Sequence, residues 1–151
     1  MSASADEFGG EETFRAKPAV LFVQLTDLDA MARTIPDLVS AEKVDERTMK
    51  CVVRPGFSFL RGTMKLEIQL LELAPNESAT MTVAAQGIGL SMRVLSHLQV
   101  AEFETGSRLT WHAQVVERKG LIAAVSSSLI RAAADQVIRH AWSSVRAQLG
   151  E

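Results

Sequence analysis

Three histidines and one cysteine are the side chains whose chemistry could support catalysis or metal binding in this sequence. None of His97, His112 and His140 has a second ligand at the short spacing typical of a metal site, so we predict no metal and no cofactor. The sequence also lacks a GxSxG elbow, a P-loop and a complete dinucleotide-binding loop. His140 is the candidate for a proton donor or a hydrogen-bond partner of a bound molecule.

The segment RPGFSFLRGT is the second unusual feature. It begins with a Pro-Gly pair, which is typical of a turn, but continues with large apolar side chains between arginines. Basic and aromatic residues together favour contact with an anionic membrane surface or with a protein partner. Alternatively, the two phenylalanines share one face of a hairpin and point into the core. The expected contact residues of this loop, residues 55–62 with the preceding arginine, are Arg54, Phe57, Phe59, Leu60 and Arg61.

The charge distribution argues against nucleic-acid binding. The net charge is −2, and the first twelve residues carry four acidic side chains without a basic one. The remainder therefore has 16 Lys and Arg against 14 Asp and Glu, an excess of 2. A nucleic-acid interface needs a stronger basic patch and usually aromatic stacking residues, whereas aromatic residues make up 5% here.

The sequence predicts a cytoplasmic protein. Residues 1–12 have neither the basic nor the apolar region of a signal peptide, and no apolar run has the length of a membrane span. Cys51 is the only cysteine, so no intrachain disulfide can form, which is typical of a reducing compartment.

A chain of 151 residues is long enough for one domain. Residues 1–10 are small and acidic and end in two glycines, so we interpret them as a disordered tail. We expect residues 11–151 to form a single domain. Its first strand is predicted at 11–17, followed by a helix that starts at Pro18 and a second helix capped by Asp27.

From about residue 41 the apolar period becomes two, which is typical of strands. The clearest strand is TMKLEIQLLEL, where the doubled Leu70-Leu71 predicts a β-bulge. Turns are predicted at Asp45-Glu46, at PNES and at ETGS. After Gly120 the period becomes helical for about thirty residues, with an apolar stripe formed by Ile122, Leu129, Ala133, Val137 and Ala141.

This order of elements predicts an α+β fold: a curved antiparallel sheet of about seven strands wrapped on a long C-terminal helix, with two short helices after the first strand. The apolar concave face of such a sheet needs a cover, and only the last helix is long enough to provide it. This is the helix-grip arrangement.

The long helix carries several small residues on its broad apolar face, which can leave volume between helix and sheet. We interpret that volume as a cavity for an apolar ligand. Alternatively, bulky sheet residues, including several methionines, fill it. The expected ligand-binding residues are Met64, Leu66, Met81, Val83, Trp111, Ala133, Val137 and His140.

The chain resembles the START-like (SRPBCC, also called Bet v 1-like) helix-grip superfamily, and within it the CoxG-like group, named after the G subunit of carbon monoxide dehydrogenase. The resemblance covers residues 12–149. It depends on FRAKPAVLFVQLTDLDAMARTIPDL, which is similar to the family's strand and proline-started helix, on the turn and strand FLRGTMKLEI, and on GSRLTWHAQV before the long helix.

The resemblance implies a hydrophobic-ligand pocket. It also implies association with the inner face of the cytoplasmic membrane and with a molybdenum hydroxylase-type enzyme such as CO dehydrogenase. We therefore expect a non-enzymatic protein that binds a lipid- or quinone-like molecule. Two alternatives stay open: a cyclase- or hydratase-like enzyme that uses His140 or His112 in the same cavity, and an assembly protein that acts through the 55–62 loop.

Overall fold

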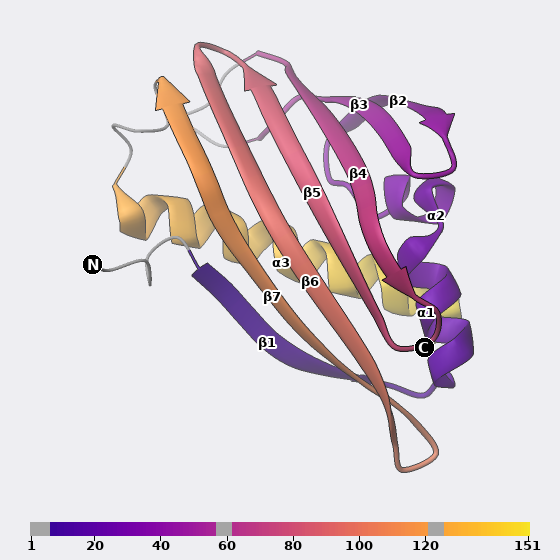
Figure 1. Cartoon of the computed structure of the whole chain (residues 1–151). Helices are drawn as coiled ribbons and strands as arrows, with labels where there is room; N and C mark the ends of the chain where they lie inside the picture. The colour runs from indigo at the N-terminus through magenta and orange to yellow at the C-terminus, as the bar shows by residue number, and fades with distance from the viewer. Residues whose placement is uncertain (1–6, 57–61, 121–125) are drawn as a thin grey trace.

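The protein forms one seven-stranded antiparallel sheet that curves around a long helix (Figure 1). The computed structural model describes residues 7–56, 62–120 and 126–151. The strand order is β1-β7-β6-β5-β4-β3-β2, so the first strand pairs with the last. The elements are β1 (Glu7–Phe14), α1 (Pro18–Thr26), α2 (Leu28–Ala32), β2 (Leu38–Asp45), β3 (Thr48–Val53), β4 (Met64–Ala74), β5 (Ser78–Gly87), β6 (Leu90–Phe103), β7 (Gly106–Gly120) and α3 (Ser127–Leu149).

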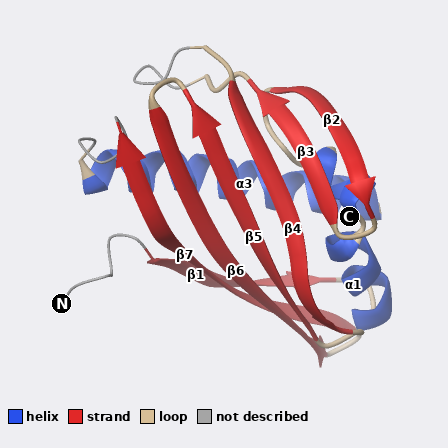
Figure 2. Cartoon of the chain, turned by 45° about the horizontal axis from the view of Figure 1, so that its top comes forward, coloured by secondary structure: helices blue, strands red, loops and turns tan. Residues whose placement is uncertain are grey.

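The predicted fold class is confirmed. Helix α3 runs across the concave face of the sheet, and α1 and α2 lie near its C-terminal end (Figures 1 and 2). Its 23 residues correspond to about 35 Å at about 1.5 Å per residue. The sequence predicted about thirty helical residues after Gly120, whereas the helix begins at Ser127. Ile122 of the predicted stripe lies outside the described residues.

The strand pattern follows the sequence closely. In β4, Met64, Ile68 and Leu70 are buried and alternate with exposed polar side chains. The register between β4 and β5 shifts between Leu70 and Glu72, and Leu71, which is skipped, is 41% exposed. The predicted β-bulge is therefore confirmed, and it allows one strand to bury Leu70 while Leu71 faces solvent.

The two short helices begin where local chemistry favours it. Pro18 is the first residue of α1, where a missing backbone N–H costs nothing. The Asp27 side chain caps α2 by accepting hydrogen bonds from the N–H groups of Asp29 and Ala30 at 2.9 and 3.2 Å. Together α1 and α2 contribute Leu21, Leu25 and Leu28 to the core, all of them buried.

The first strand differs from the prediction. It starts at Glu7 rather than at residue 11, so the interpretation of residues 1–10 as a disordered tail was wrong for residues 7–10. Gly9 and Gly10 lie opposite His112 and Trp111 of β7. A Cβ on Gly10 would lie 3.3 Å from the Trp111 indole ring, so the glycine makes room for a bulky neighbour inside the strand rather than ending a tail. Residues 1–6 lie outside the described residues.

The C-terminal end of α3 is fastened to the end of β1 and to the segment that follows it. Arg146 pairs with Glu12 at 2.6 Å and also donates a hydrogen bond to the Thr13 carbonyl at 2.8 Å. The helix ends at Gly150 in the left-handed conformation, as glycine allows. The Glu151 carboxylate then accepts hydrogen bonds from the backbone N–H groups of Arg15 and Ala16. These contacts hold the C-terminal end of α3 against the end of β1 and the segment that follows it.

Candidate functional site

A cavity of about 190 Å³ lies between the concave face of the sheet, α3 and the α1–α2 segment. It occupies the place where three clusters of buried apolar residues meet: one contains Leu25 and Val145, one contains Met31 and Met81, and one contains Ile138. The lining is mostly apolar. It consists of Gln24, Leu25, Met31, Thr34, Met81, Ser96, Leu98, Trp111, His112, Ala113, Ile138, Ala141, Trp142 and Val145.

The cavity exists because α3 presents a small residue between large ones. Ile138, Trp142 and Val145 contact the cavity from α3, and Ala141 lies between them. A methyl group at this position leaves volume that a leucine would fill. The small-residue argument from the sequence therefore applies at Ala141, which belongs to the predicted stripe and to the lining.

Two polar side chains of the lining, Thr34 and Gln24, already have partners. The Thr34 hydroxyl donates to the Met31 carbonyl at 2.7 Å. Gln24 donates to Gln148 at 2.8 Å, and Gln148 donates to the Ala30 carbonyl at 3.3 Å. These bonds connect α1, α2 and α3 around one side of the cavity.

Two tryptophans form the opposite wall. Their ring centroids lie 6.1 Å apart with the planes tilted by 51°. Phe14 packs edge-on against Trp142 at 6.4 Å. The indole N–H groups of Trp111 and Trp142 are both buried, and neither has a hydrogen-bond partner among the described residues. A buried donor without an acceptor costs free energy, so this pair is the chemically unusual part of the wall.

A groove of about 300 Å³ lies on the other side of the same wall, between β1 and α3. Trp111, Ile138 and Trp142 line both the cavity and the groove. The Trp111 nitrogen lies beside Gly10, which belongs to the groove lining. The wall is therefore one side chain thick.

Two of the predicted ligand-binding residues, Met81 and Trp111, line the cavity. Met64 is buried in the core cluster around Phe8. Leu66 and Val83 are half-buried and pack against the cluster around Met49. These three side chains are not part of the described lining of the cavity.

The face of α3 that we expected to line the cavity is rotated about the helix axis from the face that does. Val137 is 37% exposed and His140 is also exposed, so both point away from the cavity. Ala133 is half-buried and is not part of the lining. The buried stripe is Ile130, Ala134, Ile138, Ala141 and Val145, which lies about one residue, or 100°, from the predicted stripe.

This rotation removes His140 as a proton donor in the cavity. His112 is the one titratable residue in the described lining, but its exposed side chain lies on the opposite face of β7 from Trp111 and Ala113. His97 lies on the same exposed face, with Nδ1 3.0 Å from the Thr80 hydroxyl. Among the described residues no three His, Cys, Asp or Glu side chains are grouped to hold a metal ion.

Sequence reasoning missed Trp142. A signal was present, because Ile138, Ala141, Trp142 and Val145 follow helical spacing as well as the chosen stripe does. Periodicity alone cannot decide which of two apolar stripes one residue apart is buried when alanines occur in both.

The loop predicted for membrane or partner contact lies only partly within the described residues. Arg54 is exposed, and its N–H donates to the Asp37 carbonyl. Phe57, Phe59, Leu60 and Arg61 lie outside the described residues.

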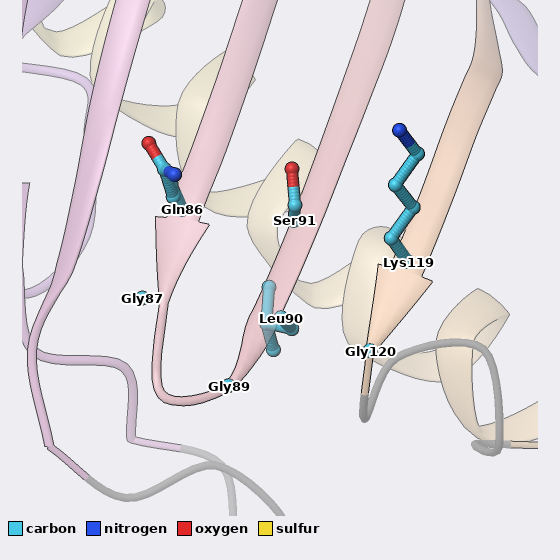
Figure 3. A pocket seen from close by; sticks show the side chains of 7 residues that line it. All are labelled: Gln86, Gly87, Gly89, Leu90, Ser91, Lys119 and Gly120. Carbon is cyan, nitrogen blue, oxygen red and sulfur yellow. The ribbon is translucent and has the colours of Figure 1, made fainter.

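A shallow hollow lies at the end of the sheet where β5 ends, β6 begins and β7 ends. It has a volume of about 370 Å³ and is lined by three glycines, Leu90 and polar side chains. Figure 3 shows Gln86, Ser91 and Lys119 on adjacent strands with their side chains pointing the same way, as their register requires. Its polar, open lining suits an apolar ligand less well than the cavity under α3 does.

Comparison with known families assigns the chain. The family model described as that of the G subunit of carbon monoxide dehydrogenase (CoxG) matches residues 10–150. The chain belongs to the CoxG family. No curated protein matched the chain in a separate search.

Solved structures show the same fold for proteins of low sequence identity. A conserved protein from Geobacillus kaustophilus has 15% identity and a TM-score of 0.88, with 95% of each chain covered. Ara h 8.0201 has 17% identity and a TM-score of 0.71, covering 96% of this CoxG family member and 98% of the other chain. A START superfamily protein from Mycobacterium smegmatis has 11% identity and a TM-score of 0.68, with 94% and 95% covered.

The predicted START-like fold and CoxG-type resemblance are therefore confirmed. Within the described part of the chain, no helix has both the length and the apolar character needed to cross a membrane.

Proposed function

We propose that this CoxG family member binds a hydrophobic small molecule, lipid- or quinone-like, in the cavity under α3, without transforming it. The cavity itself carries the proposal. An apolar guest that fills this space of about 190 Å³ removes its own surface and the apolar lining from water, which is favourable by roughly 25 cal/mol per Å² of apolar area buried. The family and the START-like fold support the same role.

The volume limits what the cavity takes up. An engineered cavity of about 150 Å³ accepts benzene, so about 190 Å³ suits one substituted ring or a short branched chain. A longer ligand must extend through the opening of the cavity. The protein would then hold one end of the ligand and leave the other for a membrane or a partner protein.

The experiment is native mass spectrometry of gently purified protein, followed by solvent extraction and identification of the bound compound. Ala141→Phe fills the cavity, and Ala147→Phe adds the same ring to the exposed face of α3 as a matched control. We expect the wild type and Ala147→Phe to carry an apolar compound and Ala141→Phe to lose it. Equal occupancy in both variants, or no binding across a broad lipid and quinone panel, would contradict the proposal.

We further propose that the protein acts as a membrane-associated accessory protein of a CO dehydrogenase or molybdenum hydroxylase-type system, with residues 55–62 as the contact. The family description and the exposed Arg54 at the start of this segment support it. Replacing Phe57 and Phe59 by serine should abolish binding to anionic vesicles or to the enzyme while ligand uptake continues. Unchanged vesicle and enzyme binding would exclude the loop.

A further inference from the structure

The indole N–H groups in the cavity wall indicate which polar group the ligand carries, whereas the apolar lining indicates only that the ligand is apolar. Neither nitrogen of Trp111 and Trp142 is reached by solvent or by an acceptor among the described residues. A tryptophan in a cavity wall usually has an acceptor for its N–H. Two such donors on adjacent rings, 6.1 Å between centroids, form a local surplus of donors at a site otherwise built for apolar contact.

The surrounding side chains do not supply the missing acceptor. Thr34 and Gln24 lie on the α1–α2 side of the cavity, across from the tryptophans, where they donate to Met31 and Gln148. Gly10, which lies beside the Trp111 nitrogen, has no side chain to offer an oxygen. Ser96, the other hydroxyl in the lining, does not accept from either nitrogen, so a molecule that enters the site can supply the acceptor.

The charges around the wall favour an uncharged acceptor. The described lining of the cavity contains no Asp, Glu, Lys or Arg. In the groove behind the wall, Arg131 and Arg139 are balanced by Glu12 and Asp135. Arg131 already donates to the Glu7 carbonyl. A carboxylate would lose its hydration here without gaining a dedicated cation, whereas a carbonyl oxygen would lose much less.

We infer that the ligand is, at its buried end, an uncharged ring-sized group bearing an acceptor oxygen, such as a ketone or ester carbonyl, and that this oxygen accepts a hydrogen bond from the indole N–H of Trp111 or Trp142. The inference rests on the proposed cavity function and adds the chemistry of recognition. Because both nitrogens are closed off from solvent, binding must also shift at least one ring.

Three probes of nearly equal shape test this inference on the intact protein: acetophenone with a neutral carbonyl, cumene with no acceptor, and benzoate with a carboxylate. The chain has two tryptophans, so a ¹⁵N–¹H spectrum of the labelled protein shows two indole signals, and Trp111→Phe and Trp142→Phe assign them. We expect acetophenone to move at least one indole proton signal downfield and to bind about five-fold more tightly than cumene. Benzoate should bind most weakly.

The Phe variants provide the second measurement, because they keep an aromatic ring in the wall and lose the N–H together with part of the ring volume, for which the cumene affinity is the reference. At least one of them should reduce the preference for acetophenone over cumene to about one while cumene affinity stays within two-fold. Equal affinities in the wild type, or a preference unchanged in both variants, would overturn the inference and leave cavity binding intact. Tightest binding of benzoate would also overturn it. If none of the three probes binds, both this inference and the proposed cavity function fail.

Discussion

Two successive turns of α3 near its C-terminal end are built differently. The last turn is fastened by Arg146 and Glu151 to the end of β1 and to the segment that follows it, and the neighbouring Val145 is buried. One turn earlier, around Ala141 and Trp142, the helix faces a cavity and two donors without partners among the described residues. A helix that is held firmly at one end can tolerate an incompletely packed contact in its middle, because the anchor and not the void sets its position.

The largest expected effect compares the packed region with the cavity. Leu21→Ala in α1 removes a side chain with 0% exposure, so we expect a loss of about 3 to 4 kcal/mol in the free energy of unfolding. Met81→Ala removes a half-buried side chain beside existing space and should cost about 1 to 2 kcal/mol. Urea denaturation measures both. Similar losses would mean that the cavity region is packed as tightly as the core around Leu21.

Next in size is the Arg146 anchor. Its guanidinium pairs with Glu12, donates to Thr13 and lies 4.4 Å above the Phe14 ring. Arg146→Ala should lower the free energy of unfolding by about 1 to 2 kcal/mol, with part of the loss screened by salt. Arg139→Ala, on the exposed face of the same helix, is the control and should change it by less than about 0.5 kcal/mol. A control that costs as much as Arg146→Ala would refute the anchor.

The Glu151 contact should contribute somewhat less. Its two oxygens accept from the N–H groups of Arg15 and Ala16 at 2.8 and 3.0 Å. We expect Glu151→Ala to cost about 1 kcal/mol and Glu151→Gln about half as much, because the amide keeps one acceptor oxygen. Thermal unfolding of the three proteins checks the order. Identical midpoints would show that this end of α3 is held by packing alone.

The rate at which a cysteine reacts with a thiol reagent also compares the packed core with the cavity. Cys51 is 2% exposed in a packed cluster, whereas Ala141 lines the cavity. Native Cys51 should react slowly with a small water-soluble reagent. A cysteine introduced as Ala141→Cys in a Cys51→Ser background should react at least ten-fold faster. The reverse order would indicate that the cavity is sealed from solvent.

The pH dependence due to Cys51 is limited to alkaline solution. Burial raises the pKa of its thiol above 9.0 by removing it from water. Above pH 9 the unfolded chain therefore loses this proton first, and the free energy of unfolding falls by up to about 1.4 kcal/mol per pH unit until the folded thiol also ionises. Cys51→Ala should lack this part of the slope. An identical decline in both proteins above pH 9 would assign it to other groups.

Local patterns were sufficient for the elements of this protein. Pro18, Asp27 and the doubled Leu70-Leu71 each influence the backbone within a few residues. The starts of the two short helices and the bulge could therefore be predicted from the sequence. The lining of the cavity depended on which face of α3 is buried and on contacts with residues far away in the chain. Val137 and Ile138 are both apolar, and only packing against the sheet decided that Ile138 faces inward. Gly10 had no visible role until the register placed it opposite Trp111.

The sequence by itself determined the order of the elements, the sheet that must be covered and the helix that covers it, because alternating and helical apolar periods are local properties. The tertiary structure decided which stripe of α3 is buried and where about 190 Å³ remains unfilled beside two indole donors. A neighbouring residue on a helix differs by about 100° in direction, and a void is the small remainder after many side chains have packed. Both depend on contacts between residues far apart in the chain.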